Sequence, residues 1–238
     1  MTSPEDELEA RDNSELRSFG RRRGRRLRSR QAGLVETLLP ELAVSLGTRA
    51  PKPLTSLFGD DIQDVWLEIG FGGGEHLVWQ AAQHPDVGLI GCEPFVDGVA
   101  KVLDAIDARA LGNVRIHPDD ARDVLRWLPE ASIGRAFILF PDPWPKKRHR
   151  KRRLVTPALV AAIARVMRAG GELRMASDIG DYAAEMLSAA LTSGAFDWQA
   201  SRADDWRSRP ADWPETRYEQ KAVREGRKSS YLRFVRRA

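Results

Sequence analysis

Residues 64–77 read DVWLEIGFGGGEHL, and this stretch decides the fold. The apolar run at 64–70 is typical of a buried strand, and the segment from Gly72 opens a helix. Gly70, Gly72 and Gly74 let the backbone bend sharply between the two elements and approach a ligand closely. Glycines also serve in purely structural turns, but the position of this turn directly after the first strand favours a cofactor-binding turn.

The same strand-then-helix pattern continues from this stretch to the C-terminus. It predicts further strands at 87–93, 113–119, 134–141, 171–178, 196–201 and 229–237, and helices at 72–84, 95–110, 121–129, 157–170 and 180–194. The glycine pair at 170–171 is expected to end the helix that starts at 157. Alternating strands and helices predict an α/β fold, with a mostly parallel sheet covered on both faces. The closing pair of strands distinguishes this sheet from an ordinary dinucleotide-binding fold.

The N-terminal segment differs in composition from the rest of the chain. Residues 1–32 are polar and highly charged. We expect them to form a disordered basic arm, because they have too few apolar side chains to bury the surface that ordering requires. Residues 33–238 are expected to form one domain. Apolar periodicity predicts a short helix at 33–47, interrupted by Pro40.

Composition excludes several classes of protein. The chain has 238 residues, of which 42% are hydrophobic and 30% are charged, as in soluble globular proteins. It has no long apolar run and no apolar secretory segment, so we expect no membrane span and a cytoplasmic location. Cys92 is the single cysteine, so an internal disulfide is excluded. We expect Cys92 to be a small core residue. The four histidines show no ligand spacing, so no metal site is expected.

Basic residues gather in two runs, although the net charge is only +4. Residues 21–30 read RRRGRRLRSR and residues 146–153 read KKRHRKRR. Like charges packed this densely repel one another, and a polyanion is the obvious partner. Either run alone could be a solvated face or a targeting tag. Two runs in one small protein favour nucleic acid.

Acidic residues follow the second and third predicted strands. Glu93 stands about twenty residues after the glycine turn, where a carboxylate can accept hydrogen bonds from both ribose hydroxyls. Asp119 and Asp120 come after the next strand, and one of them is expected to contact an adenine amino group. The alternative is a helix N-cap, and we expect Asp119 to cap the helix while Asp120 faces the cofactor. NAD enzymes share this arrangement, so it indicates an adenosine cofactor without saying which one.

The segment FPDPWPKK, residues 140–147, follows the fourth predicted strand and is the most specific motif in the chain. Ligands bind at the carboxyl ends of strands in open α/β sheets. Prolines on both sides of Asp142 stiffen the loop. Asp142 can accept hydrogen bonds from a guanine, Trp144 offers a stacking face, and Lys146 stands where phosphates would lie. A proline-rich turn alone does not explain why an acid, an aromatic ring and a basic run coincide.

At these motifs the chain resembles the bacterial tRNA (guanine-N7)-methyltransferases. The matching stretches are LEIGFGGGEHL, GCEPF, DARDVL, FPDPWPKKRHRKRRLVTP, LRMASD and TRYEQKAVREG, and the resemblance covers roughly residues 33–238. It implies a Rossmann-like class I methyltransferase fold with a seven-stranded, mostly parallel sheet and a closing antiparallel strand. It also implies transfer of the methyl group of S-adenosylmethionine to N7 of a guanine in the tRNA variable loop, at tRNA position 46. We expect tRNA as the partner, and a monomer or homodimer.

The resemblance also implies roles for individual residues. Asp142 is expected to be catalytic. The expected cofactor-binding residues are Glu68, Gly70, Gly72, Gly74, Glu93, Asp120 and Asp142. The expected substrate-binding residues are Lys146, Asp178, Thr216, Arg217, Tyr218 and Glu219. The basic run is expected to bind RNA through Lys147, Arg148, Arg150, Lys151 and Arg152. Where the family usually has His after the Trp of FPDPW, this chain has Pro145, but Asp142 and Lys146 keep their spacing.

The chemistry of the implied reaction agrees with these residue types. N7 of guanine carries a lone pair and no proton, so neither a general base nor a covalent intermediate is needed. Catalysis can therefore be positioning, aided by carboxylates that favour the positive charge on the purine. The alternatives are a methyltransferase for another RNA base or for a protein, and a non-catalytic RNA-binding scaffold. An NAD oxidoreductase is disfavoured because its glycine spacing is missing.

Overall fold

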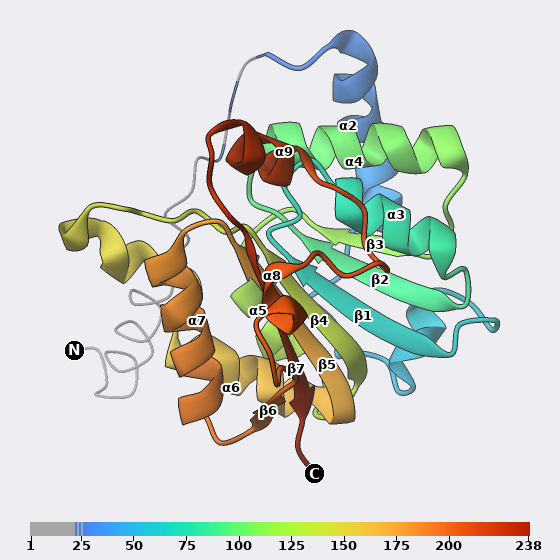
Figure 1. Ribbon diagram of the computed structural model, residues 1–238. Coiled ribbons are helices and arrows are strands. Elements are labelled where there is room, and N and C mark those ends of the chain that lie inside the picture. The colour runs from blue at the N-terminus through green and yellow to red at the C-terminus, as the bar shows by residue number, and fades with distance from the viewer. Residues whose placement is uncertain (1–21, 23, 25) are drawn as a thin grey trace, which may run out of the picture.

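The computed structural model describes residues 22, 24 and 26–238, which form an α/β fold around one seven-stranded sheet (Figure 1). The strand order is β3-β2-β1-β4-β5-β7-β6. Strands β1 to β5 are parallel, whereas β7 runs antiparallel to both β5 and β6. The predicted fold class is therefore confirmed. The strands are β1 (Asp64–Ile69), β2 (Val87–Cys92), β3 (Val114–His117), β4 (Ile133–Leu139), β5 (Met167–Ser177), β6 (Phe196–Trp198) and β7 (Ser230–Arg236).

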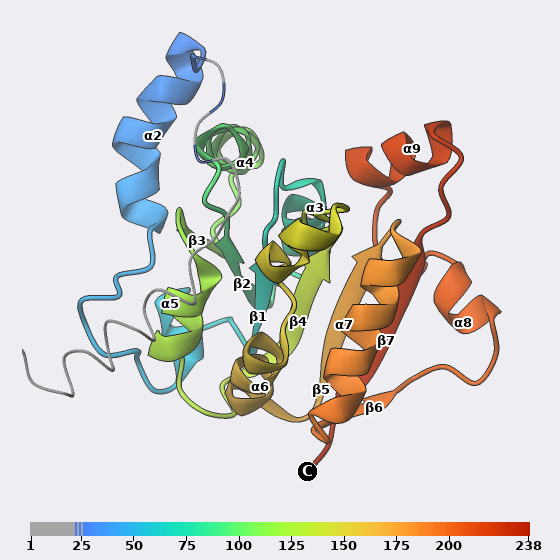
Figure 2. The ribbon, with the colours of Figure 1, turned by 90° about the vertical axis from the view of Figure 1, so that its left-hand side faces the viewer.

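Helices cover both faces of this sheet (Figure 2). The helices are α2 (Ser29–Leu42), α3 (Glu75–Gln83), α4 (Val96–Arg109), α5 (Ala121–Trp127), α6 (Pro157–Val166), α7 (Gly180–Thr192), α8 (Asp204–Arg207) and α9 (Arg217–Arg224), with short 3-10 helices η1 (Leu54–Leu57) and η2 (Lys147–Arg152). Side chains alternate between the faces along each strand. In β1, Val65 and Leu67 join the core beneath α5, α6 and α7, whereas Trp66 joins the core beneath α3 and α4. Because both faces are covered, the central strands read as continuous apolar runs.

Two helix boundaries differ from those expected from sequence. The helix that starts at Pro157 ends at Val166, not at the glycine pair 170–171, because Met167 already pairs with Ile133 as the first residue of β5. Helix α2 starts at Ser29 and includes Pro40 in its last turn without a break. At its start, Arg30 pairs with Asp104 and Asp107 of α4, both at 2.6 Å.

Of the arm expected at 1–32, residues 1–21, 23 and 25 lie outside the described residues, whereas residues 29–32 already belong to helix α2. Within the described part of the chain, no helix is long and apolar enough to cross a bilayer. The same residues contain no group of three or more His, Cys, Asp or Glu side chains that could hold a metal ion.

Candidate active site

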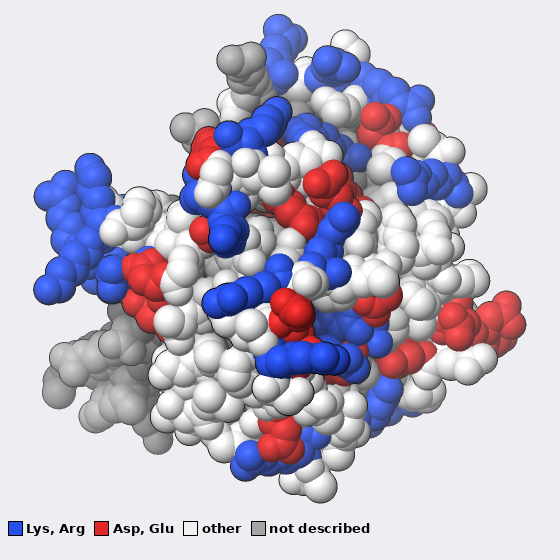
Figure 3. Space-filling view, viewed as in Figure 1, with Lys and Arg blue, Asp and Glu red and all other residues white. Residues whose placement is uncertain are grey.

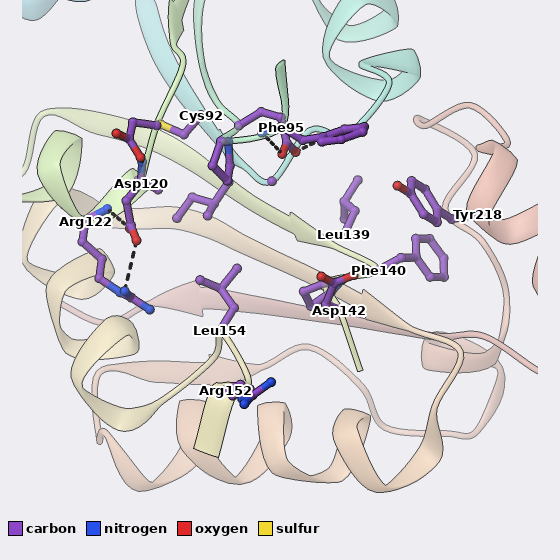
Figure 4. Close-up of a pocket in the computed structure, with 18 of the residues that line it drawn as sticks. Cys92, Phe95, Asp120, Arg122, Leu139, Phe140, Asp142, Arg152, Leu154 and Tyr218 are labelled. Atoms are coloured by element: carbon purple, nitrogen blue, oxygen red, sulfur yellow. Dashed lines mark hydrogen bonds and ion pairs between the residues drawn. The ribbon is translucent and has the colours of Figure 1, made fainter. Parts of the chain in front are cut away.

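A cavity of about 280 Å³ lies at the carboxyl ends of the parallel strands (Figure 4). The direction in which successive strands are added to the sheet reverses between the neighbouring strands β1 and β4. Open α/β sheets bind ligands at such a switch point. Each of the first four strands contributes the loop that follows it. The lining residues are Ile69, Gly70 and Gly72 at the end of β1 and after it; Cys92 to Phe95 at the end of β2 and after it; Asp119 to Arg122 after β3; Leu139 to Asp142, Trp144, Arg152 and Leu154 at the end of β4 and after it; and Tyr218 from α9.

The glycine turn forms one wall of the cavity. Gly72 has a φ of 56°, and a Cβ atom there would come 3.1 Å from the ring of Tyr218. Glycine is therefore required both by the backbone conformation and by the close approach of that ring. Gly74 does not line the cavity. It is the N-cap of α3, and a Cβ atom there would overlap Val102, so its role in the structure is to pack α3 against α4.

Glu93 lies beside the glycine turn and is held by two backbone groups. Its Oε2 accepts a hydrogen bond from the Gly72 N–H at 2.8 Å, and its Oε1 accepts one from the Phe95 N–H at 2.9 Å. The side chain is buried. Burial raises the pKa of this carboxyl, and the two N–H donors partly oppose that shift. The carboxylate is thus fixed in orientation at the edge of the cavity.

Asp119 and Asp120 both line the cavity, but their roles at the helix start are the reverse of those expected. Asp120 is the N-cap of α5: its Oδ1 accepts from the Arg122 N–H at 3.0 Å, and its Oδ2 lies 3.1 Å from the Arg122 guanidinium. Asp119 instead accepts from the Asp120 N–H at 2.9 Å and pairs with Arg22 at 2.8 Å. The expectation that Asp119 caps the helix was wrong, because the helix begins at Ala121 and the residue directly before it takes the cap.

The N-terminal segment reaches the rim of this cavity. Besides the Arg22–Asp119 pair, the carbonyl of Arg22 accepts from the Val96 N–H at 3.1 Å. The Gly24 N–H donates to Asp97 at 2.9 Å. These contacts place Arg22 and Gly24 beside the start of α4.

Asp142 lies on the loop after β4, on the same side of the cavity as Tyr218 and away from Asp120 (Figure 4). Two residues of this loop, Phe140 and Trp144, have left-handed backbones with φ of 50° and 41°. Such conformations are uncommon for large side chains and mark a constrained loop. Burial, together with the negative charges of Glu93 and Asp142, raises the pKa of Tyr218. These three groups therefore share one electrostatic environment.

The basic run forms the protruding helix η2, seen as the blue cluster at the left of Figure 3. Its members are not equivalent. Arg150 forms ion pairs with Asp181 and Glu185 of α7, and the guanidinium of Arg152 lies 5.1 Å from the centre of the Trp144 ring. Within the run at 146–153, the exposed cations that form no ion pair with a described carboxylate are Lys146, Lys147, Arg148 and Lys151.

Arg153, directly after η2, anchors the whole loop. Its side chain is 2% exposed and lies 2.7 Å from Glu185 and 3.2 Å from Asp181. Its Nε donates to the carbonyl of Pro143 at 2.9 Å. This residue was not singled out in the sequence, where it is indistinguishable from its basic neighbours.

The expected substrate-binding residues do not all reach the cavity. Tyr218 lines it, whereas Thr216 and Glu219 are buried as the two halves of the capping box that starts α9. Arg217 pairs with Glu75, and Asp178 pairs with Arg227 at 2.6 Å. Lys146 is exposed and lies outside the residues that line the cavity.

Glu68 also lies outside the cavity lining. It is 2% exposed, and its Oε2 lies 2.7 Å from Nδ1 of His76 on α3. Sequence reasoning missed this contact. The alternation of β1 nevertheless carries a signal, because Glu68 shares its face of the sheet with Trp66, the face that α3 covers.

Comparisons with known proteins agree on one class of enzyme. Residues 63–232 match a family model described as "Putative methyltransferase". The chain is 51% identical over 239 residues to a tRNA (guanine-N(7)-)-methyltransferase of Rhodopseudomonas palustris strain BisB18, covering 100% of this chain and 95% of the relative. It is 52% identical over 218 residues to the protein of the same name from Chelativorans sp. strain BNC1, covering 92% and 94%.

Solved structures are similar at the level of the fold. A 16S rRNA methyltransferase, KamB, aligns with a TM-score of 0.56 at 16% identity, covering 80% of this chain and 96% of that one. The aminoglycoside resistance methyltransferase NpmB1 aligns with a TM-score of 0.52 at 15% identity, covering 79% and 95%. At these identities the likeness concerns the architecture alone.

Proposed function

Because the chain belongs to the family of tRNA (guanine-N(7)-)-methyltransferases, we propose that it transfers the methyl group of S-adenosylmethionine to N7 of guanine 46 in the variable loop of tRNA. One observation carries the proposal. Relatives that are about 50% identical over nearly their whole length share this name. The cavity agrees with it, because Asp142 lines the cavity from the loop after β4. A tRNA substrate also makes the cytoplasm the proposed location.

The cavity residues fit a nucleoside cofactor with a charged tail. Both oxygens of the Glu93 carboxylate are oriented by backbone donors and keep lone pairs for two ribose hydroxyls. Asp120 lines the same cavity as the apolar Ile69 and Leu154 and can accept from an adenine amino group. Gly70 and Gly72 leave room for the backbone to approach the rest of the molecule. We therefore assign cofactor binding to Gly70, Gly72, Glu93, Asp120 and Asp142.

When bound, S-adenosylmethionine supplies a methyl group already activated on a sulfonium ion. The chain then has to hold N7 of the guanine in line with the bond that breaks. Asp142 can accept hydrogen bonds from the N1–H and N2 amino group of the base, which orients the ring. Its negative charge, with that of Glu93 nearby, also favours the positive charge that develops on the purine. Tyr218 offers a ring on the same side of the cavity for stacking.

The surface beside the cavity supports an RNA substrate. Lys146, Lys147, Arg148 and Lys151 project from the loop that carries Asp142, so phosphates bound there would lie next to the reacting base. Arg150 and Arg152 belong to the same run. Their contacts with α7 and with Trp144 give them the additional role of orienting η2.

The test is incubation with isotope-labelled S-adenosylmethionine and unmodified tRNA transcripts, followed by nucleoside analysis. We expect labelled 7-methylguanosine, and we expect it to vanish for a matched transcript in which guanine 46 is replaced by adenine. A different methylated nucleoside would favour a methyltransferase for another RNA base. No methylation in spite of tRNA binding would favour a non-catalytic RNA-binding scaffold.

A further inference from the structure

Exposed cations also gather on α9 and on the segment that follows it. Arg217, Lys221 and Arg224 are spaced three or four residues apart, so they share one face of the helix. Lys228 stands four residues beyond the helix, and all four residues are exposed. Ala222, on the opposite face, is buried. The basic face of α9 is therefore turned to solvent.

The carboxylates at this helix do not neutralise its basic face. Glu219 is buried, and it accepts a hydrogen bond from the Tyr231 hydroxyl. Glu225 pairs with Arg227, and its carboxylate lies 4.0 Å from the ammonium group of Lys221. An exposed pair at that distance contributes little. The outer face of α9 therefore keeps an excess of positive charge.

Three of these cations are available to an outside partner. Arg217 pairs with Glu75, so it is engaged within the protein. In the part of the chain that the structure describes, Arg224 and Lys228 form no ion pair with a carboxylate. Lys221 has only its exposed contact within the helix. We call Lys221, Arg224 and Lys228 the α9 surface.

The cavity lies between η2 and the α9 surface. Tyr218, in the first turn of α9, lines the cavity, and so does Arg152, the last residue of η2. In Figure 4 these two side chains lie on different sides of Asp142. A base bound at Asp142 therefore has a basic element on each side of it.

The helix that carries this surface is fixed in place and is not purely polar. Thr216 and Glu219 close the capping box at its start. Tyr218 is 51% exposed and Val223 is 65% exposed, and they are two of the three large hydrophobic side chains that the described residues expose. A fixed helix with cations beside an exposed aromatic ring suits nucleic acid, because bases stack on rings and phosphates pair with cations.

We propose that the α9 surface is a second phosphate-binding surface for the RNA substrate, and that the strand with the methylated guanine crosses the cavity from η2 to α9. Phosphates on one side of the guanine bind the cations of η2, and phosphates on the other side bind the α9 surface. The identity of the RNA and of the base rests on the proposed function. A nucleic-acid strand fits better than an acidic protein, because a strand can span both basic elements while one of its bases enters the cavity.

The test compares three triple variants of the full chain. The first changes the three residues of the α9 surface to alanine, which removes their charges and keeps a high helix propensity. The matched control keeps the charges by exchanging the two basic residue types: Lys221→Arg, Arg224→Lys and Lys228→Arg. The third variant changes three unpaired cations of η2 to alanine: Lys147, Arg148 and Lys151.

The first readout is the tRNA affinity of each variant over a range of salt concentrations. Each phosphate contact contributes about 0.7 to 0.9 to the slope of log affinity against log salt, so the α9 alanine variant should flatten the slope by about 2 to 3. The charge-retaining control should keep the wild-type slope. A wild-type slope in the α9 alanine variant would overturn the proposal, because the face would then be merely solvated. An equal loss in the charge-retaining control would also overturn it.

The second readout is phosphate ethylation interference, which shows which phosphates of the tRNA the protein needs. Ethylation on both sides of the methylated guanine should weaken binding to the wild-type protein. The η2 variant should lose this sensitivity on one side of the guanine, and the α9 alanine variant should lose it on the other side. Loss at the same phosphates in both variants would overturn the proposed path of the strand.

The two proposals can fail separately. If the wild-type protein forms no 7-methylguanosine, the proposed function fails, whereas the salt slopes still decide whether the α9 surface binds tRNA. If 7-methylguanosine forms and the α9 alanine variant binds tRNA with the wild-type slope, only the second phosphate-binding surface is refuted.

Discussion

Replacing Glu93 with alanine tests the assignment of the cofactor site most directly. In the wild-type structure the carboxylate is aimed by the Gly72 and Phe95 N–H groups, so its remaining lone pairs have a fixed direction. Alanine removes the acceptor for the ribose hydroxyls. It also frees the two backbone donors, which water can reach at the edge of the cavity.

The expected loss follows from the type of contact. A hydrogen bond to a charged group contributes roughly 1.5 to 3 kcal/mol. Since each 1.4 kcal/mol is a factor of ten, the Kd for S-adenosylmethionine should rise by about 10- to 150-fold. The lower end applies if only one hydroxyl is bound, and the upper end if both are.

The assay is calorimetric titration of the protein with S-adenosylmethionine at several pH values. Burial raises the pKa of Glu93, so its carboxylate gains a proton at a higher pH than an exposed glutamate does. The protonated form has lost an acceptor. Wild-type affinity should therefore be full above that pKa and fall as the pH drops through it. Glu93→Ala should lack this acid-side loss.

Two outcomes would refute this reasoning. Unchanged affinity in Glu93→Ala would mean that the ribose does not bind at this carboxylate. A weaker variant that keeps the wild-type pH profile would mean that another group titrates. Circular dichroism of the variant provides the control for correct folding.

Three further perturbations address the chemistry, the RNA surface and the loop anchor. Asp142→Ala should lower kcat/KM for tRNA by at least about 100-fold, measured by methyl incorporation, because the residue orients and stabilises the reacting base. Its stability should change by less than about 0.5 kcal/mol, since the side chain is exposed. Changing Lys147, Arg148 and Lys151 together to alanine should flatten the slope of log tRNA affinity against log salt by about 2 to 3, at roughly 0.7 to 0.9 for each phosphate contact. Arg153→Met should lower the free energy of unfolding by about 1 to 2 kcal/mol in urea titrations, because it removes the hydrogen bond to the Pro143 carbonyl, while Asp181 and Glu185 are half-exposed and still pair with Arg150.

Each of these predictions has a matched control or a clear contrary result. Near-normal turnover of Asp142→Ala at saturating tRNA would remove this residue from the reaction. For the RNA surface, the control replaces Arg49, Lys52 and Arg109, three exposed cations that belong neither to η2 nor to the cavity lining. Equal salt slopes for the two triple variants would mean that η2 is not the phosphate surface. Wild-type stability of Arg153→Met would mean that the loop is held elsewhere.

The fold could be predicted from sequence wherever local pattern and tertiary pairing agree. The apolar runs at β1 and β2 lie between glycine and proline turns, and they became central strands. The helix after Pro157 shows the opposite case. Its apolar periodicity continues to the glycine pair, but Met167 pairs with Ile133, so strand pairing ends the helix four residues earlier. A local pattern contains no information about that partner.

The site could be predicted to the extent that position along a strand fixes position in space. Glu93 and Asp142 follow strands whose carboxyl ends meet, so both line the cavity. The direction of a side chain within a loop or a buried face is harder to predict. The capping roles of Asp119 and Asp120 were reversed, and the contact between Glu68 and His76 depends on how α3 packs on β1. Pairwise packing decides such cases, and a single sequence does not display it.

The left-handed backbones of Phe140 and Trp144 have a consequence for engineering this protein. Each such conformation costs a non-glycine residue on the order of 1 to 3 kcal/mol, so glycine at these positions would relieve strain. It would also loosen the loop that holds Asp142. Ala110 and Ala131 have the same kind of backbone, with φ of 51° and 49°, at turns outside the cavity lining. A search for a more heat-resistant form should therefore begin with glycine at those two turns, because there the relief of strain leaves the shape of the reaction site untouched.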